Sequence, residues 1–291
     1  MDTRSRLEKM AMAARVALIM EAAAEKPGNV TPTRRFDDMD FSSFILSANV
    51  IASAMESSGR KPVGEIIHEA VTASVKAAGV NVHLGAVLLL APLAKAFVKH
   101  GAVKRKSVAD VLGGLAKKDA QLAYKAIRMA KPGGLGRAEK YDVSKSPDAS
   151  LLEVMRQAEG RDWVAHEYSN GFSITLGHGA PELAANVNSG LGFNEAVVQT
   201  YLGIMGAYPD SLVARKNGME MALEMSREAA RILSLGGMHS SRGRRAVYEF
   251  DLALRSDGNI LNPGTSADLT AAALFVYFLG NGYKAIKPAG G

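Results

Sequence analysis

The sequence predicts an all-α protein that folds as a single compact multi-helix domain over residues 1–291, with functional groups in the loops between helices. Apolar residues recur at helical spacing along nearly the whole chain, and no run of β-branched residues alternates with polar ones. No stretch has the composition of an interdomain linker. The Gly-rich segment 131–147 is explained equally well as a functional loop or as a boundary.

The first half of the chain is expected to form seven helices. Residues 4–25 place Leu7, Met10 and Ala14 on one face, and the helix-breaking pair Pro27-Gly28 follows. Ser107 and Pro147 are typical start residues, as caps or in the first turn. The expected ranges are 4–25, 41–57, 62–78, 84–100, 107–129, 147–159 and 162–175.

The second half continues the same pattern with five further helices. Pro181 and Ser266 again supply start signals. The expected ranges are 181–189, 195–205, 218–235, 240–256 and 266–280. Alanine is abundant, which permits close packing between helices, and the many Ala and Met residues could line either a core or a homodimer interface.

The composition excludes several classes of protein. The chain has no cysteine, so disulfides, zinc-thiolate sites and thiol nucleophiles are ruled out. The net charge is +6, but the basic residues are dispersed and aromatic content is only 6%, so we expect no nucleic-acid partner. The longest apolar runs, 86–94 and 269–279, are too short to cross a bilayer, and the N-terminus does not resemble a signal peptide. We therefore expect a soluble, cytoplasmic protein with no membrane partner.

Five polar segments interrupt the helices and are candidates for chemistry. The first, 26–40, brings three carboxylates together at Asp37, Asp38 and Asp40, beside Lys26 and Arg35. Such carboxylates can simply stabilise a helix start in water. They can also hold Mg²⁺, which is typically bound by one or two carboxylates plus phosphate oxygens.

The second and third segments are Gly-containing loops. In 79–85, Asn81 or His83 can cap the following helix, or the helix start can bind phosphate with His83 as acid, base or hydrogen-bond donor. The segment 132–143 is rich in glycine, which allows close backbone approach to a ligand but is also common in plain turns. It is not a P-loop, and it follows no strand.

The fourth and fifth segments lie in the second half. The segment 209–218 combines Asp210 with the adjacent bases Arg215 and Lys216, and it is either a capped turn or an anion site. The segment 262–268 runs from Asn262 through a Pro-Gly turn to Asp268 at a helix start, where a carboxylate is favourable for stability alone. No Gly-x-Ser-x-Gly or His-Glu-x-x-His pattern is present.

Taken together and in this order, the segments resemble the triphosphoribosyl-dephospho-CoA synthase family over roughly residues 15 to 280. A Lys-Pro-Gly loop leading into Asp-Met-Asp is matched by 26–28 and 38–40, and a Gly-x-Asn-Thr-x-x-Gly loop by 79–85. The remaining motifs resemble 210–218 and 262–269. The resemblance implies an all-helical enzyme that moves the triphosphoribosyl group of ATP to the ribose 2′-hydroxyl of dephospho-CoA and releases adenine.

The resemblance suggests roles for the residues in these segments. Cleavage of a ribosyl–adenine bond passes through an oxocarbenium-like state served by carboxylates, and the triphosphate needs Mg²⁺ and cationic side chains. The hypothesised metal ligands are Asp38 and Asp40, and the hypothesised catalytic residues are Asp210 (second metal or general base), His83 and Asp268. The hypothesised binding residues are Lys26, Arg35, Asn81, Gly85, Arg215, Lys216 and Asn262.

Two alternatives remain open. Members that act with citrate lyase usually carry Asn-Thr-His-Lys-Gly, whereas this chain has Asn-Val-His-Leu-Gly at 81–85. Together with 132–143, this resembles a branch of archaea and one-carbon-metabolising bacteria, so the enzyme could be an ATP-dependent ribosyl or phosphoribosyl transferase with a tetrahydromethanopterin-type (pterin) acceptor. A non-catalytic helical nucleotide-binding or scaffold protein is the second alternative, and it predicts that the five segments do not converge in space.

Overall fold

The computed structural model describes residues 2–286, and within them the predicted all-α class is confirmed: there are fourteen α-helices and no strand. Short 3₁₀ turns lie at Glu56–Gly59 and Gly237–His239, and a π-helix lies at Thr175–Gly179. The α-helices are α1 (Thr3–Ala23), α2 (Phe41–Met55), α3 (Val63–Ala78), α4 (Leu84–His100), α5 (Arg105–Gly113), α6 (Lys117–Ala130), α7 (Leu151–Ala158), α8 (Trp163–Ser169), α9 (Ala180–Asn188), α10 (Phe193–Ala207), α11 (Ser211–Asn217), α12 (Met219–Ser234), α13 (Ser241–Leu254) and α14 (Gly264–Asn281).

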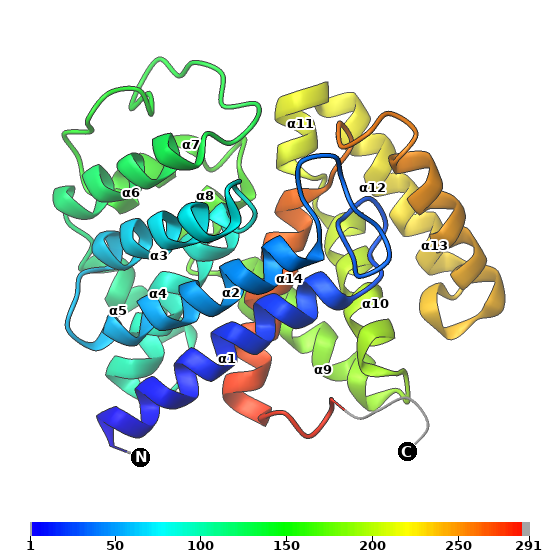
Figure 1. Cartoon of the computed structure of the whole chain (residues 1–291), viewed down its shortest axis with the longest axis horizontal. Helices are drawn as coiled ribbons and strands as arrows, with labels where there is room; N and C mark the ends of the chain where they lie inside the picture. Colours follow the sequence, from blue (N-terminus) through cyan, green and yellow to red (C-terminus); the bar gives the residue numbers. More distant parts are fainter. Residues whose placement is uncertain (1, 287–291) are drawn as a thin grey trace.

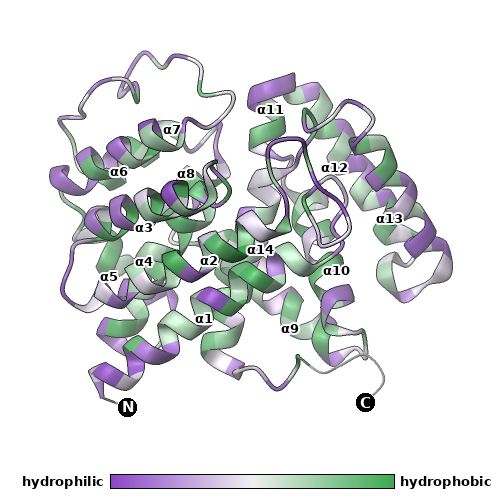
Figure 2. Cartoon of the chain, viewed as in Figure 1, coloured by the Kyte–Doolittle hydropathy of each residue, from purple (hydrophilic) through white to green (hydrophobic). Residues whose placement is uncertain are grey.

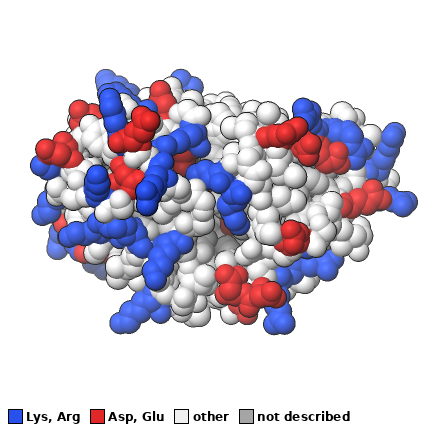
Figure 3. All heavy atoms as spheres, turned by 90° about the horizontal axis from the view of Figure 1, so that it is seen from above, with Lys and Arg blue, Asp and Glu red and all other residues white. Residues whose placement is uncertain are grey.

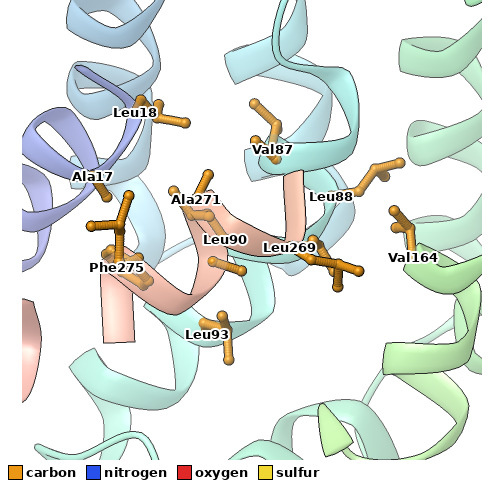
Figure 4. Close-up of a cluster of buried hydrophobic side chains, with 14 of the residues drawn as sticks. Ala17, Leu18, Val87, Leu88, Leu90, Leu93, Val164, Leu269, Ala271 and Phe275 are labelled. Carbon is orange, nitrogen blue, oxygen red and sulfur yellow. The ribbon is translucent and has the colours of Figure 1, made fainter. Parts of the chain in front are cut away.

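The last helix, α14, runs through the middle of the molecule (Figure 1). It packs against α1, α4 and α10 and is buried on nearly every side, which explains why its sequence is apolar all round and not amphipathic. In Figure 4, Leu269, Ala271 and Phe275 of this helix lie among side chains from α1, α4 and α8. Because α14 is packed on nearly every side, its first turns, including Thr265 and Ser266, are held in a fixed position.

The other helices form two groups on either side of α14 (Figure 1). On one side α2, α3 and α6 pack in sequence, and on the other α10 packs against α12 and α9. Hydrophilic residues concentrate on the outer helix faces and in the loops, as Figure 2 shows. The loop after α1 is held against α13 and α10 of the second group, because Gly28 N–H donates to Asp251 Oδ1 (2.8 Å) and Asn29 Nδ2 donates to the Tyr201 hydroxyl (2.7 Å).

The single helix expected at 107–129 is wrong: α5 and α6 are separated there by Gly114, Leu115 and Ala116. The glycine pair at 113–114 weakens the helix, and Asp119 then caps α6 by accepting from the backbone N–H of Ala116 (2.8 Å). The other oxygen of Asp119 accepts from the Gly64 N–H (2.7 Å), so that the break also joins α6 to the start of α3.

Other local differences from expectation also occur. The helix expected at 162–175 ends at Ser169, because Gly171 (φ 63°) and Phe172 (φ 58°) adopt a left-handed backbone before the π-helix begins. Part of the segment 209–218 is helical as α11, and α7 starts from a capping box at Ser150 and not at Pro147.

The Gly-rich segment between α6 and α7 is a loop, as predicted. It is fastened to α6 at two points: the Tyr124 hydroxyl donates to the carbonyl of Tyr141, and Arg128 donates to the carbonyl of Val143, both at 2.6 Å. Asp142 closes the loop on itself by accepting from the Ala138 N–H (2.8 Å).

Among residues 2–286, no single helix combines the length and apolarity needed to span a membrane; α4 and α5 meet that test only as a pair, bent by 108°.

Candidate active site

A cavity of about 470 Å³ lies where the two helix groups and α14 meet. Seen from above, a hollow lies near the middle of the molecular face, and Lys and Arg side chains are concentrated to its left (Figure 3). Every one of the five polar segments contributes to the cavity wall. The contributions include Asn29 and Met39 from the first segment, 81–85 from the second, Pro132 to Asp142 from the third, Leu212 and Arg215 from the fourth, and Asn262, Thr265 and Asp268 from the fifth.

One end of the cavity is polar and is built where the starts of α4 and α14 touch. A Cβ placed on Gly85 would lie 2.0 Å from Oδ2 of Asp268, so only glycine leaves room for this carboxylate. Asn81 Oδ1 accepts from the Leu84 N–H (3.2 Å) and caps α4 beside it. Burial raises the pKa of Asp268 well above its usual range, and the carboxylates of Glu21, Asp210 and Asp162 raise it further, against the effect of the Ala86 N–H.

Glu21, near the end of α1, brings a second carboxylate to the same end. It is almost completely buried, and its Oε1 lies 2.9 Å from Nζ of Lys26. Lys26 also donates to the backbone carbonyls of Glu21 and Ala24. The Glu21–Lys26 pair thus connects the loop after α1 to the cavity wall. Glu21 lines the cavity, and Lys26 does not.

His83, directly before α4, is the third polar group of this end. It is 3% exposed, its Nδ1 lies 2.7 Å from Ser47 Oγ of α2, and the edge of Phe44 packs against the ring at 5.0 Å between centroids. Its Nε2 is buried with no partner among the described residues. Burial first, and then the charge of Lys26, lower the pKa of His83 to about 3, so the imidazole is neutral near pH 7.

This buried imidazole predicts an acid-sensitive fold. Because the pKa of His83 falls from about 6.5 in the unfolded chain to about 3 when folded, its contribution to stability is complete above pH 6.5 and is lost as the pH falls below it. Between pH 7 and pH 5 we expect the free energy of unfolding, measured with urea, to drop by about 2 kcal/mol from this group. His83→Gln should remove that part of the drop, and His68→Gln should leave it in place; an equal drop in both variants would contradict the assignment.

Elsewhere in the cavity wall, an ion pair joins Asp162, at the start of α8, to Arg215, in the last turn of α11. Asp162 Oδ1 accepts from the Val164 N–H (2.8 Å) and caps α8, while its Oδ2 accepts from Arg215 Nη1 (2.5 Å). Arg215 Nε is buried without a partner in the described part of the chain. Arg161 lines the same wall and is exposed.

The other end of the cavity is mainly apolar, although Asp142 and Arg161 also line it near Tyr124. It lies under the Gly-rich loop and between α6, α7 and α8, and two tyrosines, Tyr124 and Tyr141, lie among the aliphatic side chains. The aliphatic lining residues here are Ile127, Leu135, Val143, Val154, Met155, Ala158, Val164 and Ala165. The cavity therefore has a carboxylate-bearing end and an end suited to an apolar or aromatic part of a ligand.

The structure brings six of the predicted site residues together around this cavity: Asn81, His83, Gly85, Arg215, Asn262 and Asp268. It places the others elsewhere. Asp38 and Asp40 are exposed and do not line the cavity, and Asp40 caps α2 by accepting from the Ser43 N–H (3.1 Å). Arg35 lies beside Asp40 in a shallow surface depression, and Lys216 is exposed, with Nζ on the carbonyl of Asn259 (3.2 Å).

Asp210 is fully buried and contacts protein on both oxygens. Its Oδ1 accepts from the N–H groups of Leu212 (2.9 Å) and Val213 (3.0 Å) at the start of α11. Its Oδ2 accepts from the N–H (2.7 Å) and the hydroxyl (2.9 Å) of Ser266 in α14. One carboxylate thus joins the starts of two helices that carry Arg215 and Asp268.

Sequence reasoning missed Glu21, Asn29, Asp162 and Ser47. Glu21 could have been found, because it continues the buried face of α1 formed by Ala14 and Leu18, where an acid is unexpected. Ser47 lies in α2 and meets His83 only through the tertiary fold, so no local pattern marks it.

The fold and the cavity define an all-α protein with an interhelical pocket whose polar end carries two carboxylates and a neutral imidazole. Residues 7–287 match the family model described as ATP:dephospho-CoA triphosphoribosyl transferase, and the chain belongs to this family. The matched range covers nearly the whole sequence, so the predicted resemblance is confirmed.

Individual relatives agree with this result. A protein of Stutzerimonas stutzeri named probable 2-(5''-triphosphoribosyl)-3'-dephosphocoenzyme-A synthase is 30% identical over 203 residues, which is 68% of this chain and 61% of the relative. The chain thus matches about three fifths of that relative's length. A Vibrio cholerae protein of the same name is 26% identical over 87% of this chain and 82% of its own. A crystal structure from Archaeoglobus fulgidus, provisionally named triphosphoribosyl-dephospho-CoA synthase, is 27% identical with a TM-score of 0.64, covering 81% of this chain and 99% of that one.

Proposed function

We propose that this chain transfers the triphosphoribosyl group of ATP to a hydroxyl of dephospho-CoA or a related acceptor, with release of adenine. The observation that carries the proposal is the convergence of all five polar segments on one cavity. The scaffold interpretation predicted that they would not converge, and that prediction is wrong. Family membership supports the same reaction. A homodimer and a cytoplasmic location stay predictions.

In the proposed reaction the bond between C1′ of ribose and N9 of adenine breaks, and its electron pair stays with adenine. The acceptor hydroxyl oxygen forms the new bond to C1′, and its proton ends on adenine, so that atoms and charge balance. Positive charge builds on the ribose between these events, and carboxylates stabilise it. Asp268 and Glu21 are the carboxylates of the polar end and are assigned this role.

The triphosphate needs countercharge that the wall does not provide. The charged lining residues are four acids (Glu21, Asp142, Asp162 and Asp268) and two arginines (Arg161 and Arg215). Residues 2–286 contain no cluster of three or more acidic or His side chains that could hold a metal alone. A pair of carboxylates fits Mg²⁺ that arrives already bound to phosphate, since this ion keeps few protein ligands. Asp268 and Glu21 would hold it in place of Asp38 and Asp40, and it would neutralise the triphosphate.

The remaining residues of the site bind a substrate or hold other parts of the site in position. Arg215 is assigned to an anionic group of a substrate, because it lines the cavity beside Asp162 and its buried Nε has no partner among residues 2–286. Asp210 is assigned a positioning role through its bonds to α11 and α14, in place of general base or metal ligand. The apolar end with Tyr124 and Tyr141 is assigned to the acceptor. This end would bind a pterin ring as well as the adenine of dephospho-CoA. The test therefore includes a pterin acceptor beside dephospho-CoA.

The test is adenine release from Mg-ATP, followed by chromatography, without acceptor and with dephospho-CoA or a pterin precursor bearing a free hydroxyl. Adenine formed only with dephospho-CoA supports the proposal in full. Adenine formed only with the pterin compound would show that the acceptor is a pterin and not dephospho-CoA. If neither yields adenine and ATP does not shift the melting temperature, the proposed function is refuted.

Two adjacent bases provide a direct test of the anion site. Arg215→Ala should raise the KM for one substrate by about tenfold or more, because a charge-assisted contact is worth about 1.5–3 kcal/mol. Lys216→Ala should change it little, because that ammonium lies outside the wall. Steady-state kinetics on both variants shows which of the two side chains binds the substrate anion. A larger increase in KM for Lys216→Ala would place the anion outside the cavity.

A further inference from the structure

Two buried serines form a hydrogen-bonded chain that reaches His83 from behind the cavity wall. Ser74 Oγ of α3 lies 2.6 Å from Ser47 Oγ of α2, and Ser47 Oγ lies 2.7 Å from Nδ1 of His83. Ser47 is fully buried and Ser74 is 4% exposed, so that neither hydroxyl is free to turn to solvent. The three residues come from α2, α3 and the start of α4, which pack against one another.

Only one direction of donation satisfies every hydroxyl in this chain. If Ser74 donates to Ser47, and Ser47 donates to Nδ1, then each O–H has an acceptor. In the reverse direction the Ser74 hydroxyl needs another acceptor, and none is bonded to it within residues 2–286. A buried donor without an acceptor costs about 1–3 kcal/mol, so the first direction is favoured.

This direction decides which ring nitrogen carries hydrogen. Nδ1 accepts, so the proton of the neutral ring is on Nε2. Nε2 is the buried nitrogen that has no partner in the described chain, on a residue of the cavity wall. A buried N–H that is left unpaired at a cavity is explained when a ligand supplies the acceptor.

We propose that Ser47 and Ser74 are positioning residues that fix His83 as its Nε2–H tautomer, and that this N–H donates a hydrogen bond to the base that leaves the ribose. The identity of the base rests on the proposed function. When the bond from C1′ to N9 breaks, negative charge develops on the purine ring, and a donor aimed at a ring nitrogen stabilises it. No proton is transferred from His83; the adenine proton still comes from the acceptor hydroxyl.

A neutral donor suits this position better than a cation. The imidazole loses water on burial and lies near the Lys26 charge, both of which oppose protonation. Phe44 packs edge-on against the ring, with 83° between the planes, and limits its rotation. The donor is therefore held in place before the substrate binds, which is the condition under which such groups contribute most.

The tautomer is measured directly by long-range ¹H–¹⁵N correlation spectra of the ¹⁵N-labelled full chain at pH 7, with the His83 signals assigned by their loss in His83→Gln. We expect the pattern of an Nε2–H ring in the wild type and a mixture of tautomers in Ser47→Ala. An Nδ1–H ring or an imidazolium in the wild type would overturn the proposal. This readout needs no substrate, so it stands apart from any failure of the proposed function.

Kinetics then separates positioning from mere structure. Ser47→Ala should lower kcat for adenine release about tenfold with little change in KM, Ser47→Thr should restore most of it, and the exposed Ser53→Ala of the same helix should match wild type. His83→Leu should cost about 10²-fold, with partial recovery in His83→Gln. A full kcat in Ser47→Ala despite a mixed tautomer would refute the donor role, as would a change confined to KM. If wild type releases no adenine, the spectra alone decide the tautomer.

Discussion

Asp268→Asn is expected to abolish adenine release, with a loss of about 10²- to 10³-fold in turnover, while the chain stays folded. The carboxylate lies at the meeting point of α4 and α14, and replacing it by an amide removes its charge without changing its volume. Both the charge stabilisation of the ribose and the hold on Mg-triphosphate depend on that charge under the proposed function.

The same variant should be at least as stable as wild type at neutral pH. The pKa of Asp268 is raised in the folded state, mainly by burial and then by neighbouring carboxylates. The folded chain therefore binds this proton more tightly than the unfolded chain, and wild-type stability falls as the pH rises above the unfolded value near 3.9. Asp268→Asn removes this fall. Urea unfolding at several pH values measures it, and Asp257→Asn, at an exposed loop residue, is the control.

Two results would contradict the assignment. A variant that keeps full turnover would show that the Asp268 carboxylate is not used in the reaction. A variant that is less stable at every pH would show that Asp268 is retained for the fold. Loss of activity with equal or higher stability is the combination expected of a strained functional group.

Periodicity predicted the helices well because most of them have one buried face. The failures occurred where a single residue's environment decided the backbone. At 113–114, two glycines and the cap by Asp119 ended a helix that the apolar pattern would have continued. At 209–218, Asp210 caps a short helix that the polar composition of the segment did not indicate.

The site could be predicted in part, because its residues cluster in short loops at helix starts. Asn81, His83 and Asp268 were found in this way and lie on one wall. The carboxylates at Asp38 and Asp40 have the same local appearance, yet they are exposed and do not line the cavity, and only the tertiary fold reveals this. Ser47 could not be found at all, since its partner His83 is 36 residues away in the sequence.

Gly85→Ala is expected to reduce turnover by about 10²-fold, although it adds only a single methyl group to the cavity wall. The new Cβ would lie 2.0 Å from Oδ2 and 2.5 Å from Cγ of Asp268, so the carboxylate must move away from the start of α4. A displaced catalytic group of this kind costs roughly two orders of magnitude in rate. Overpacking should also lower the free energy of unfolding by about 1–3 kcal/mol.

Gly113→Ala is the matched control, because a Cβ at that helical glycine would meet nothing within 4 Å. A double-mutant cycle with Asp268→Ala identifies the cause: once the side chain at 268 is shortened, Gly85→Ala should no longer destabilise the protein, while activity stays lost. Equal destabilisation in both backgrounds would show that the alanine clashes with something other than Asp268. A Gly85→Ala enzyme with normal kcat would show that the reaction tolerates a shifted carboxylate, and the contact between α4 and α14 would then be one of packing alone.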